Sequence, residues 1–491
     1  MAELLFFVVP EAGFEPARLS TTVFETAASA VPPLGRRTEL YPIPANSSAY
    51  VLKCTNALIK HIAASSLVVC VSFSLEALYA RAHNKQLSQI SGAVRRISMI
   101  NETMYRLGNA PSAIRELFAY GMERKAQIGE DKVFDFSIGN PSVPAPAKVA
   151  ETMHKLADMP PAELHAYSHA SGLDSTKTAI AENLNRRFGT DYAAKNFYLT
   201  TGAASCLSCC IKAVILEPGD EIIVISPFFP EYRVWIEADG GKCVEVPARE
   251  DNFQIDFDAL GAAINERTRA VIINSPNNPV GVVYTRETLE QLSALLHKKR
   301  EEFGSSLYLI SDEPYRELVY GAEVPWVPAI YDNTLVCYSW SKSLSLPGDR
   351  IGYVLVPNEV EESERVMFAV AGAGRALGYI CAPVFFQRVI AECVDEPVNV
   401  AAYAANRELL TSGLDELGYN YIAPDGAFYL WMQALEPDAQ AFSDKAKEHE
   451  LLLVPSDSFG VGGWVRIGYC VSADVIRNSM PAFAALKKDY E

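Results

Sequence analysis

A lysine at position 342 stands among serines, directly after an apolar run, in the segment SWSKSLSLPGDRIGYVLVP at residues 339–357. An unprotonated lysine amine is a nucleophile toward aldehydes, and burial lowers a lysine pKa by disfavouring the charged form. Ser339, Ser341 and Arg350 could offer hydroxyl groups and a guanidinium fork to a phosphate. Most lysines lie on the surface, but this place at the end of a predicted strand favours a site that binds a phosphate and uses an amine.

A loop of small residues, LTTGAASCL, leads into a predicted helix. Gly202, Ala203 and Ala204 would let backbone amides approach an anion, and the N-terminus of the helix would favour negative charge. In isolation, a simple tight turn explains this pattern equally well.

Polar and aromatic side chains also follow other predicted strands. In the run LYLISDEPY, Asp312 follows an apolar strand and could pair with a protonated ring nitrogen, while Tyr315 could donate its phenol to a ring oxygen. Asn278 offers an amide, although Asn-Pro is also a common turn dipeptide. Phe229 could stack on an aromatic ring, or it could simply pack in the core.

One ligand accounts for all of these groups. Pyridoxal 5′-phosphate (PLP) carries an aldehyde for Lys342, a ring nitrogen for Asp312, a ring hydroxyl and a phosphate. The sequence therefore predicts PLP as cofactor, with Lys342 forming the Schiff base and Ser339, Ser341 and Arg350 holding the phosphate.

These residues need a scaffold that brings strand ends together. The runs KNFYLTTGA, DEIIVISP, RAVIINSP, SLYLISDE and TLVCYSWSK alternate with helical stretches such as RETLEQLSALLHKKREEFG. Strands that are apolar on both faces are typical of a parallel sheet covered by helices. We expect an α/β fold with a mostly parallel central sheet and helices on both faces. Such sheets bind ligands beyond the carboxyl ends of their strands, so the motifs could face one crevice.

The bulk composition excludes some functions. The 491 residues carry a formal net charge of −17, which argues against a general nucleic-acid or anionic-membrane binder. The most apolar run, residues 62–75, is shorter than the roughly 20 residues that cross a bilayer. We therefore expect neither a nucleic-acid nor a membrane partner.

The chain has ten cysteines, of which Cys206, Cys209 and Cys210 crowd one apolar stretch. No second pair or histidine cluster completes a zinc set, so we expect no metal and interpret the three as reduced core residues rather than a redox motif. Reduced cysteines without a secretory signal favour the cytoplasm.

Composition changes near Met99. Residues 1–98 contain no Asp and carry a net charge of +3, whereas the remainder carries −20. The early stretch resembles extensions that arise when a start codon is assigned too far upstream, across an RNA gene. We favour this interpretation over a genuine accessory region and expect residues 1–98 not to belong to the enzyme fold.

From Met99 onward the chain resembles the class I/II aminotransferases, which are fold-type-I PLP enzymes. SWSKSLSLPGDRIGY resembles the family's lysine signature, and NSPNNPVG and SDEPYREL resemble its other two central motifs. AYSHASGLDSTKTAIAENL resembles the segment whose tyrosine, here Tyr167, contacts the phosphate of the neighbouring subunit's cofactor. GGWVRIGYC resembles the segment whose arginine, here Arg466, binds the substrate α-carboxylate, and FSIGNPSVPAP resembles the glycine loop that lines the substrate site, here around Gly139.

The resemblance implies an architecture and an assembly. Residues 146–384 would form a large PLP domain, and residues 99–145 and 385–491 would together form a smaller α/β domain. Shared active sites would imply a homodimer.

The resemblance also implies a reaction, which is ping-pong transfer of an amino group between an L-amino acid and a 2-oxo acid. Some dicarboxylate-specific members place a lysine near where Ala204 stands, so an aspartate preference is in doubt, and Phe228, Phe229 and Tyr232 could tolerate aromatic or aliphatic substrates. A PLP-dependent C–S β-lyase remains the main alternative. A non-catalytic PLP-binding regulator is disfavoured, because residues 1–98 lack a convincing helix-turn-helix.

Overall fold

The computed structural model describes residues 6–8, 69–71, 100–110 and 112–491. The chain divides into two units, residues 1–99 and residues 100–491. In the first unit, β1 (Phe6–Val8) and β2 (Val69–Val71) pair antiparallel. Nearly all of residues 1–98, including most of the apolar run 62–75, lies outside the described residues. Among the described helices, none combines the length and the apolar character needed to cross a membrane.

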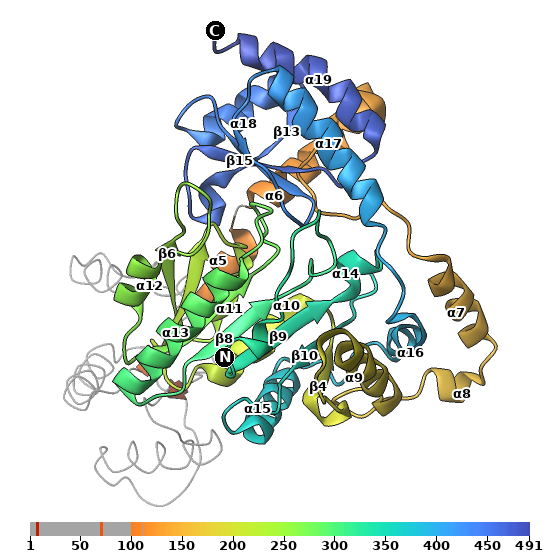
Figure 1. Cartoon of the computed structure of the whole chain (residues 1–491), viewed down its shortest axis with the longest axis vertical. Coiled ribbons are helices and arrows are strands. Elements are labelled where there is room, and N and C mark those ends of the chain that lie inside the picture. The colour runs from red at the N-terminus through yellow and green to blue at the C-terminus, as the bar shows by residue number, and fades with distance from the viewer. Residues whose placement is uncertain (1–5, 9–68, 72–99, 111) are drawn as a thin grey trace, which may run out of the picture. The chain divides into compact units, whose positions relative to one another are not determined.

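The second unit is organised around a seven-stranded sheet with the order β4-β10-β9-β8-β7-β5-β6 (Figure 1). The neighbouring pairs among β5 to β9 are parallel, and β10 runs antiparallel to both of its neighbours. This confirms the predicted α/β fold with a mostly parallel sheet. The strands are β4 (Phe197–Thr200), β5 (Glu221–Ser226), β6 (Lys242–Pro247), β7 (Thr268–Asn274), β8 (Tyr308–Asp312), β9 (Thr334–Ser339) and β10 (Gly352–Leu355).

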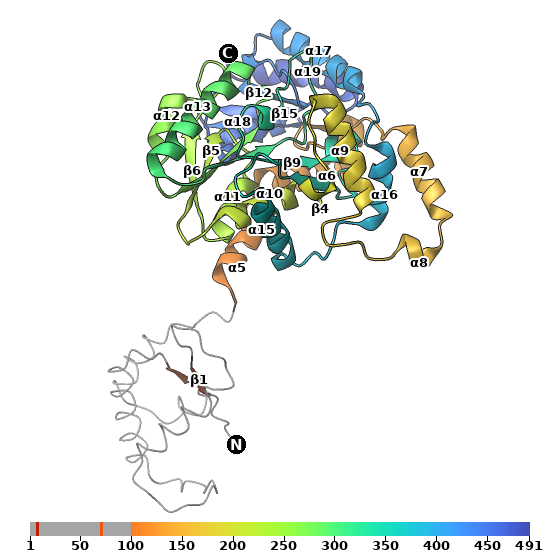
Figure 2. The same cartoon turned by 60° about the horizontal axis from the view of Figure 1, so that its bottom comes forward.

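Helices cover both faces of this sheet (Figures 1 and 2). Along β5, Ile222 and Val224 pack in one apolar cluster while Ile223 and Ile225 pack in another, as the alternation of a strand requires. The first face is covered by α10 (Ala203–Val214), α11 (Glu231–Ala238) and α15 (Ser363–Ala376). The second face is covered by α12 (Phe257–Ala263), α13 (Arg286–Phe303), α7 (Ala147–Ala157), α9 (Asp174–Phe188) and α16 (Val384–Cys393).

Three cysteines of α10 contribute to the packing of this helix against the sheet. Cys206, Cys209 and Cys210 are buried and free, and they belong to the apolar cluster between α10 and the strands. They act as small core residues, in agreement with the sequence interpretation. Within the described residues, His, Cys, Asp and Glu side chains form no group of three that could hold a metal.

A second, smaller assembly combines segments from both ends of the unit. Its antiparallel sheet has the order β11-β12-β15-β14, and β3 pairs in parallel with β13, so residues near 134 lie beside residues near 451. Its strands are β3 (Phe134–Asp135), β11 (Tyr421–Ile422), β12 (Tyr429–Gln433), β13 (Leu451–Leu452), β14 (Val454–Pro455) and β15 (Trp464–Gly468). Its helices are α6 (Ala113–Ile128), α17 (Val400–Glu416), α18 (Ala439–Glu448) and α19 (Ala473–Lys488), and α5 (Glu102–Asn109) precedes them.

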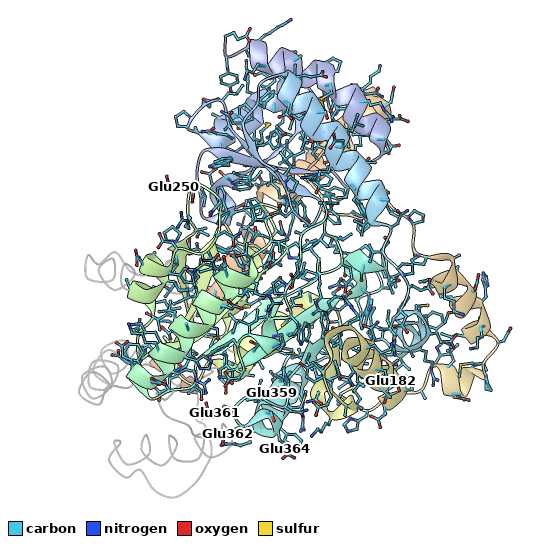
Figure 3. The ribbon with its side chains drawn as sticks, in the orientation of Figure 1. Glu182, Glu250, Glu359, Glu361, Glu362 and Glu364 are labelled. Carbon is cyan, nitrogen blue, oxygen red and sulfur yellow. The ribbon has the colours of Figure 1, made fainter. Side chains whose placement is uncertain are left out.

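The acidic excess of the chain is carried in part by exposed glutamates. Figure 3 labels six of them at the surface, Glu182, Glu250, Glu359, Glu361, Glu362 and Glu364. Their carboxylates are solvated, so they contribute to net charge without a desolvation cost.

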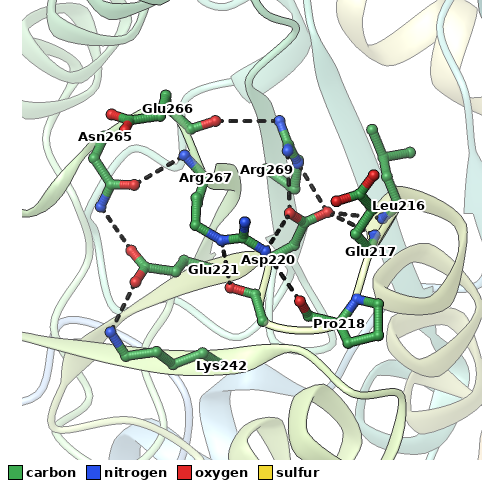
Figure 4. Close-up of polar contacts among 11 residues, drawn as sticks. Leu216, Glu217, Pro218, Asp220, Glu221, Lys242, Asn265, Glu266, Arg267 and Arg269 are labelled. Carbon is green, nitrogen blue, oxygen red and sulfur yellow. Dashed lines mark hydrogen bonds and ion pairs between the residues drawn. The ribbon is translucent and has the colours of Figure 1, made fainter.

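Asp220 is a buried carboxylate that directly precedes the amino end of β5, and Figure 4 shows its polar contacts. Asp220 is fully buried and accepts from the Leu216 and Glu217 amides at 2.9 and 3.0 Å. Arg269 Nη2 donates to Asp220 Oδ1 at 3.0 Å, and Arg267 Nη2 lies 3.5 Å from the same oxygen. The Arg269 bond and these amides hold the pKa of Asp220 at about 2.

We predict that Asp220→Asn destabilises the fold. The folded-state pKa of Asp220 is lowered, so its contribution is full above the unfolded pKa near 4 and is lost as the pH falls from there toward 2. The expected loss in the free energy of unfolding at pH 7 is on the order of 2 kcal/mol, measured by urea denaturation. Asp251→Asn is the control, since Asp251 and its partner Arg249 are both exposed. Equal urea midpoints for Asp220→Asn and wild type would contradict this account.

Candidate active site

Lys342 lies where β9 ends and the short helix α14 (Trp340–Ser343) begins. Ser339 caps that helix, accepting from the Ser341 amide at 3.0 Å, and the two serine hydroxyls lie 2.6 Å apart. The Lys342 Nζ donates to the Gly139 carbonyl at 2.5 Å. Burial lowers the pKa of Lys342 to about 8, and the charges of Arg466 and Arg350 push in the same direction. The structure thus places a partly buried amine with reduced proton affinity at the end of a central strand.

The predicted phosphate loop and Arg350 meet beside this lysine. Gly202 has a positive φ of 96° and caps α10, whose first turn contains Ala203 and Ala204. A Cβ added to Gly202 would come within 2.6 Å of the Arg350 Nη2, so a side chain there would displace the guanidinium. β10 fixes this arrangement, because Gly352 pairs with both Thr200 and Ser339 and so holds the ends of β4 and β9 side by side.

Asp312 ends β8 and is buried. Its Oδ2 accepts from the Tyr232 hydroxyl at 2.5 Å, and its Oδ1 has no hydrogen-bond partner among the described residues. Burial raises the pKa of Asp312 to about 7, although the Tyr232 hydrogen bond opposes that shift. The ring of Phe229 lies edge-on to Tyr232, with centroids 5.8 Å apart. A carboxylate with one unused oxygen in such a place suits a cationic ring N–H.

Asn278 and Arg466 meet across the two assemblies. Arg466, in β15, donates from Nη1 to Asn278 Oδ1 at 3.0 Å and from Nη2 to the Ser137 carbonyl at 2.6 Å. Its Nε has no partner among the described residues, and the side chain is buried. Asn274 orients this corner: it donates to the Asp312 carbonyl at 2.8 Å and accepts from the Asn278 amide at 2.7 Å.

Tyr315 and Tyr429 lie near Lys342 and Arg466, respectively. The Tyr315 and Tyr429 hydroxyls lie 3.2 Å apart. The Lys342 Nζ lies 6.0 Å from the centre of the Tyr315 ring. A Cβ added to Gly139 would overlap the Tyr429 hydroxyl, which explains why glycine stands at that position.

The structure therefore brings most of the predicted site residues into one connected set of contacts, and it leaves one apart. Tyr167 lies on the segment between α8 (Pro161–Leu164) and α9 and is 84% exposed. Tyr232, which the sequence analysis names among the aromatic residues that could tolerate aromatic or aliphatic substrates, donates its hydroxyl to Asp312 Oδ2.

Three further residues of this site were missed by sequence reasoning: Tyr429, Asn274 and Ser137. Asn274 carried a usable signal, since it ends the strand that precedes Asn278. Tyr429 and Ser137 lie in segments whose position depends on the pairing of distant strands.

The residues present fit PLP. The amine of Lys342 suits an aldehyde, and the unused Asp312 Oδ1 suits a protonated ring nitrogen. The N-terminus of α10, the serines and Arg350 suit a phosphate dianion, because exposed backbone N–H groups, hydroxyls and a guanidinium all donate.

Comparison with known proteins identifies relatives along most of the chain. The family model for aminotransferase class I and II matches residues 131–483. The chain is 31% identical to an aspartate/prephenate aminotransferase of Thermus thermophilus over 383 residues, covering 76% of this chain and 95% of the relative. It is 28% identical to aromatic-amino-acid aminotransferase 2 of Thermococcus litoralis over 400 residues, covering 77% and 96%. The crystal structure of an amino transferase from Eubacterium rectale has 54% identity and a TM-score of 0.79, covering 80% of this chain and all of that one.

We predict that cofactor-free protein captures added PLP through Lys342 with a pH-dependent rate. The neutral fraction of an amine with a pKa of about 8 rises about tenfold per pH unit below 8 and then levels off. The visible absorbance band that develops after mixing, measured from pH 6 to 9, should follow this curve.

Borohydride reduction should then fix the label on the peptide that contains Lys342. Lys342→Arg should remove the label. Lys212→Arg is the control and should be labelled like wild type, since Lys212 lies on α10 and is paired with Asp239. Label on another peptide, or a rate that is flat between pH 6 and 8, would refute the assignment.

Proposed function

The chain belongs to the class I and II aminotransferases, and from that premise we propose how its residues divide the work of amino-group transfer. The enzyme is a transaminase that exchanges an amino group between an L-amino acid and a 2-oxo acid. The observation that carries the assignment of roles is the Lys342 amine, which is partly buried, depressed in pKa and at the same end of the sheet as the buried Asp312.

We propose PLP as the cofactor. When bound, PLP would supply an electrophilic carbon for the substrate amine and a ring that accepts electrons from the substrate α-carbon. Asp312 would hold the proton on the ring nitrogen, since its free oxygen has no other use within the described residues. Gly202, Ala203, Ala204, Ser339, Ser341 and Arg350 would hold the phosphate, and Phe229 would pack against the ring.

Lys342 is proposed as the base that removes a proton from the substrate α-carbon and returns one during the other half of the cycle. A pKa of about 8 suits both directions near neutral pH, because the amine then holds and releases a proton at comparable cost. Tyr315 would donate its phenol to the ring oxygen. Burial raises the pKa of Tyr315 well above its usual value, so the phenol stays protonated.

Arg466 is proposed to bind the substrate α-carboxylate. Its Nη groups are already held by Asn278 and the Ser137 carbonyl, so the guanidinium plane is fixed before a substrate arrives. Gly139 would form the opposite wall, since the Tyr429 hydroxyl occupies the space that a side chain at position 139 would need. A fixed fork orients a carboxylate as well as binding it.

A homodimer with shared active sites is also proposed. Tyr167 is 84% exposed and lies outside the contacts of its own site, as expected of a residue that serves a second copy. The eight cysteines between positions 206 and 470 are free, which supports the cytoplasm as the compartment. Residues 99–145 with 385–491 are proposed as the small domain and residues 146–384 as the large one.

The amino-acid donor can belong to one of several substrate classes. The named relatives act on aspartate, prephenate or aromatic amino acids. Ala204 stands in the first turn of α10 and has no charge. A cation at this position would be needed for the loop to favour a substrate with a second carboxylate. A panel of aspartate, aromatic and aliphatic donors against 2-oxoglutarate and pyruvate will identify the donor class.

We predict that Arg466→Lys impairs both half-reactions in this panel while PLP stays bound. Lysine keeps the charge but loses the fork, and the loss of one charge-assisted contact should lower kcat/KM by about 30-fold, on the order of 2 kcal/mol. Both the amino acid and the 2-oxo acid should suffer, because one arginine serves both.

Arg477→Lys on α19, where the side chain is exposed and paired with Asp474, is the control. Unchanged efficiency in Arg466→Lys would remove Arg466 from the site. Release of ammonia and pyruvate by wild type without amino-group exchange would favour the C–S β-lyase instead.

We also predict that a chain starting at Met99 is dimeric and active. Its first described helix, α5, is capped by Asn101, whose side chain accepts from the Thr103 and Met104 amides at 3.0 and 3.2 Å. Size-exclusion chromatography and the same activity panel provide the measurement. Cofactor-free or aggregated protein would show that residues 1–98 contribute to the enzyme fold.

A further inference from the structure

Tyr429 contacts Arg466, Tyr315 and Gly139, but it lies outside the sequence motifs from which the site was predicted. It is the first residue of β12 and is 3% exposed. Its ring lies under the Arg466 guanidinium, with the Cζ atom 4.5 Å from the ring centre. Its hydroxyl lies 3.2 Å from the Tyr315 hydroxyl and against Gly139.

The strand register explains the contact between the ring and Arg466. Tyr429 pairs with Gly468 in the antiparallel β12–β15 ladder, and Arg466 is two residues from Gly468, so both side chains emerge on one face. A Cβ added to Gly468 would lie 2.9 Å from the Ile138 carbonyl oxygen, so glycine at this position lets the segment that contains Ser137 approach β15 closely. Phe459 covers the guanidinium as well, at 5.2 Å. The Arg466 guanidinium is therefore held by hydrogen bonds to Asn278 and Ser137 and by contact with two aromatic rings.

The Tyr429 hydroxyl makes a different contact from the ring, because it lies 3.2 Å from the Tyr315 hydroxyl. A phenol has one proton to donate, and only one proton can lie between two hydroxyl oxygens. If Tyr429 donates to Tyr315, the proton of Tyr315 is free to point toward a bound group. Burial raises the pKa values of both phenols, so both remain protonated at working pH.

We propose that Tyr429 is a positioning residue with two separable roles. Its ring fixes the plane of Arg466 for the substrate carboxylate, and its hydroxyl donates to Tyr315 so that the Tyr315 phenol is directed at the cofactor ring oxygen. This inference rests on the proposed roles of Arg466 and Tyr315.

The test separates ring from hydroxyl in the holoenzyme. Tyr429→Phe keeps the ring and should leave KM for amino acids and 2-oxo acids within about twofold of wild type. It should raise the pH midpoint of the bound cofactor's visible absorbance change by at least about half a pH unit, because a misdirected Tyr315 stabilises negative charge on the ring oxygen less well. A purely structural hydroxyl would not move that midpoint.

Tyr429→Leu removes the ring as well, and it should raise KM for both amino acids and 2-oxo acids at least about tenfold. Affinity for 3-phenylpropanoate and maleate, carboxylates with no amino or oxo group, should fall in parallel, measured by the shift of the visible band. Tyr429→Met replaces this variant if Tyr429→Leu does not retain PLP. Tyr419→Phe is the matched control, since Tyr419 is a buried tyrosine of the same core whose hydroxyl donates to the Phe483 carbonyl.

Two outcomes would overturn the inference. One is a Tyr429→Phe midpoint equal to wild type, and the other is carboxylate affinity in Tyr429→Leu or Tyr429→Met equal to that of Tyr419→Phe. Arg466→Lys separates a failure of the role proposed for Arg466 from a failure of the inference about Tyr429. If it binds carboxylates as well as wild type, the proposed function of Arg466 is wrong and the ring role falls with it. If Arg466→Lys is impaired while the apolar Tyr429 variants are not, only the inference about Tyr429 is overturned.

Discussion

The site depends on a carboxylate that is buried with one oxygen unused. Asp312 accepts from Tyr232 on one side only, and burial raises its pKa to about 7. An unsatisfied buried acceptor costs on the order of 1–3 kcal/mol, so the fold holds Asp312 there at a cost to its own stability. That cost is offset when a cationic donor binds, and PLP with a protonated ring nitrogen is such a donor. The surrounding contacts preserve this arrangement: Tyr232 behind the carboxylate, Asn274 on its backbone carbonyl and parallel neighbours on both sides of β8.

The second constraint is that the two assemblies must meet at Lys342 and Asn278. Asn278 and Lys342 follow strands of the seven-stranded sheet and Asp312 ends one, whereas Gly139 and Arg466 belong to segments toward either end of the unit 100–491. Two hydrogen bonds join these sets directly, from Lys342 to the Gly139 carbonyl and from Arg466 to Asn278. The groups proposed for the substrate carboxylate and for the cofactor therefore come from different assemblies.

Apolar runs in the sequence were enough to predict the residues at the strand ends, and the family resemblance supplied Gly139 and Arg466, whereas contacts that depend on strand register were missed. Five of the seven central strands were identified from apolar runs, and the residues at their carboxyl ends include Asp312 and Lys342. β6 and β10 were not identified, because β6 is partly exposed and β10 is a short run inside the lysine motif. Tyr429 could not be found, since its contact with Arg466 is created by the register of β12 on β15.

Stability and chemistry are divided between the two ends of the same parallel strands. At the amino end of β5, Asp220 is saturated with donors, and its pKa is held at about 2. At the carboxyl end of β8, Asp312 has one donor and a pKa near neutrality. Both side chains are inaccessible to solvent, but the balance of causes differs: burial is the main reason that the pKa of Asp312 is raised, whereas hydrogen bonds from Arg269 and two backbone amides outweigh burial at Asp220. A fully satisfied carboxylate stabilises the sheet and is closed to ligands, whereas a partly satisfied one keeps an oxygen for a ligand. Parallel strands suit this division, because all their carboxyl ends open toward one crevice while their amino ends can be sealed by ion pairs.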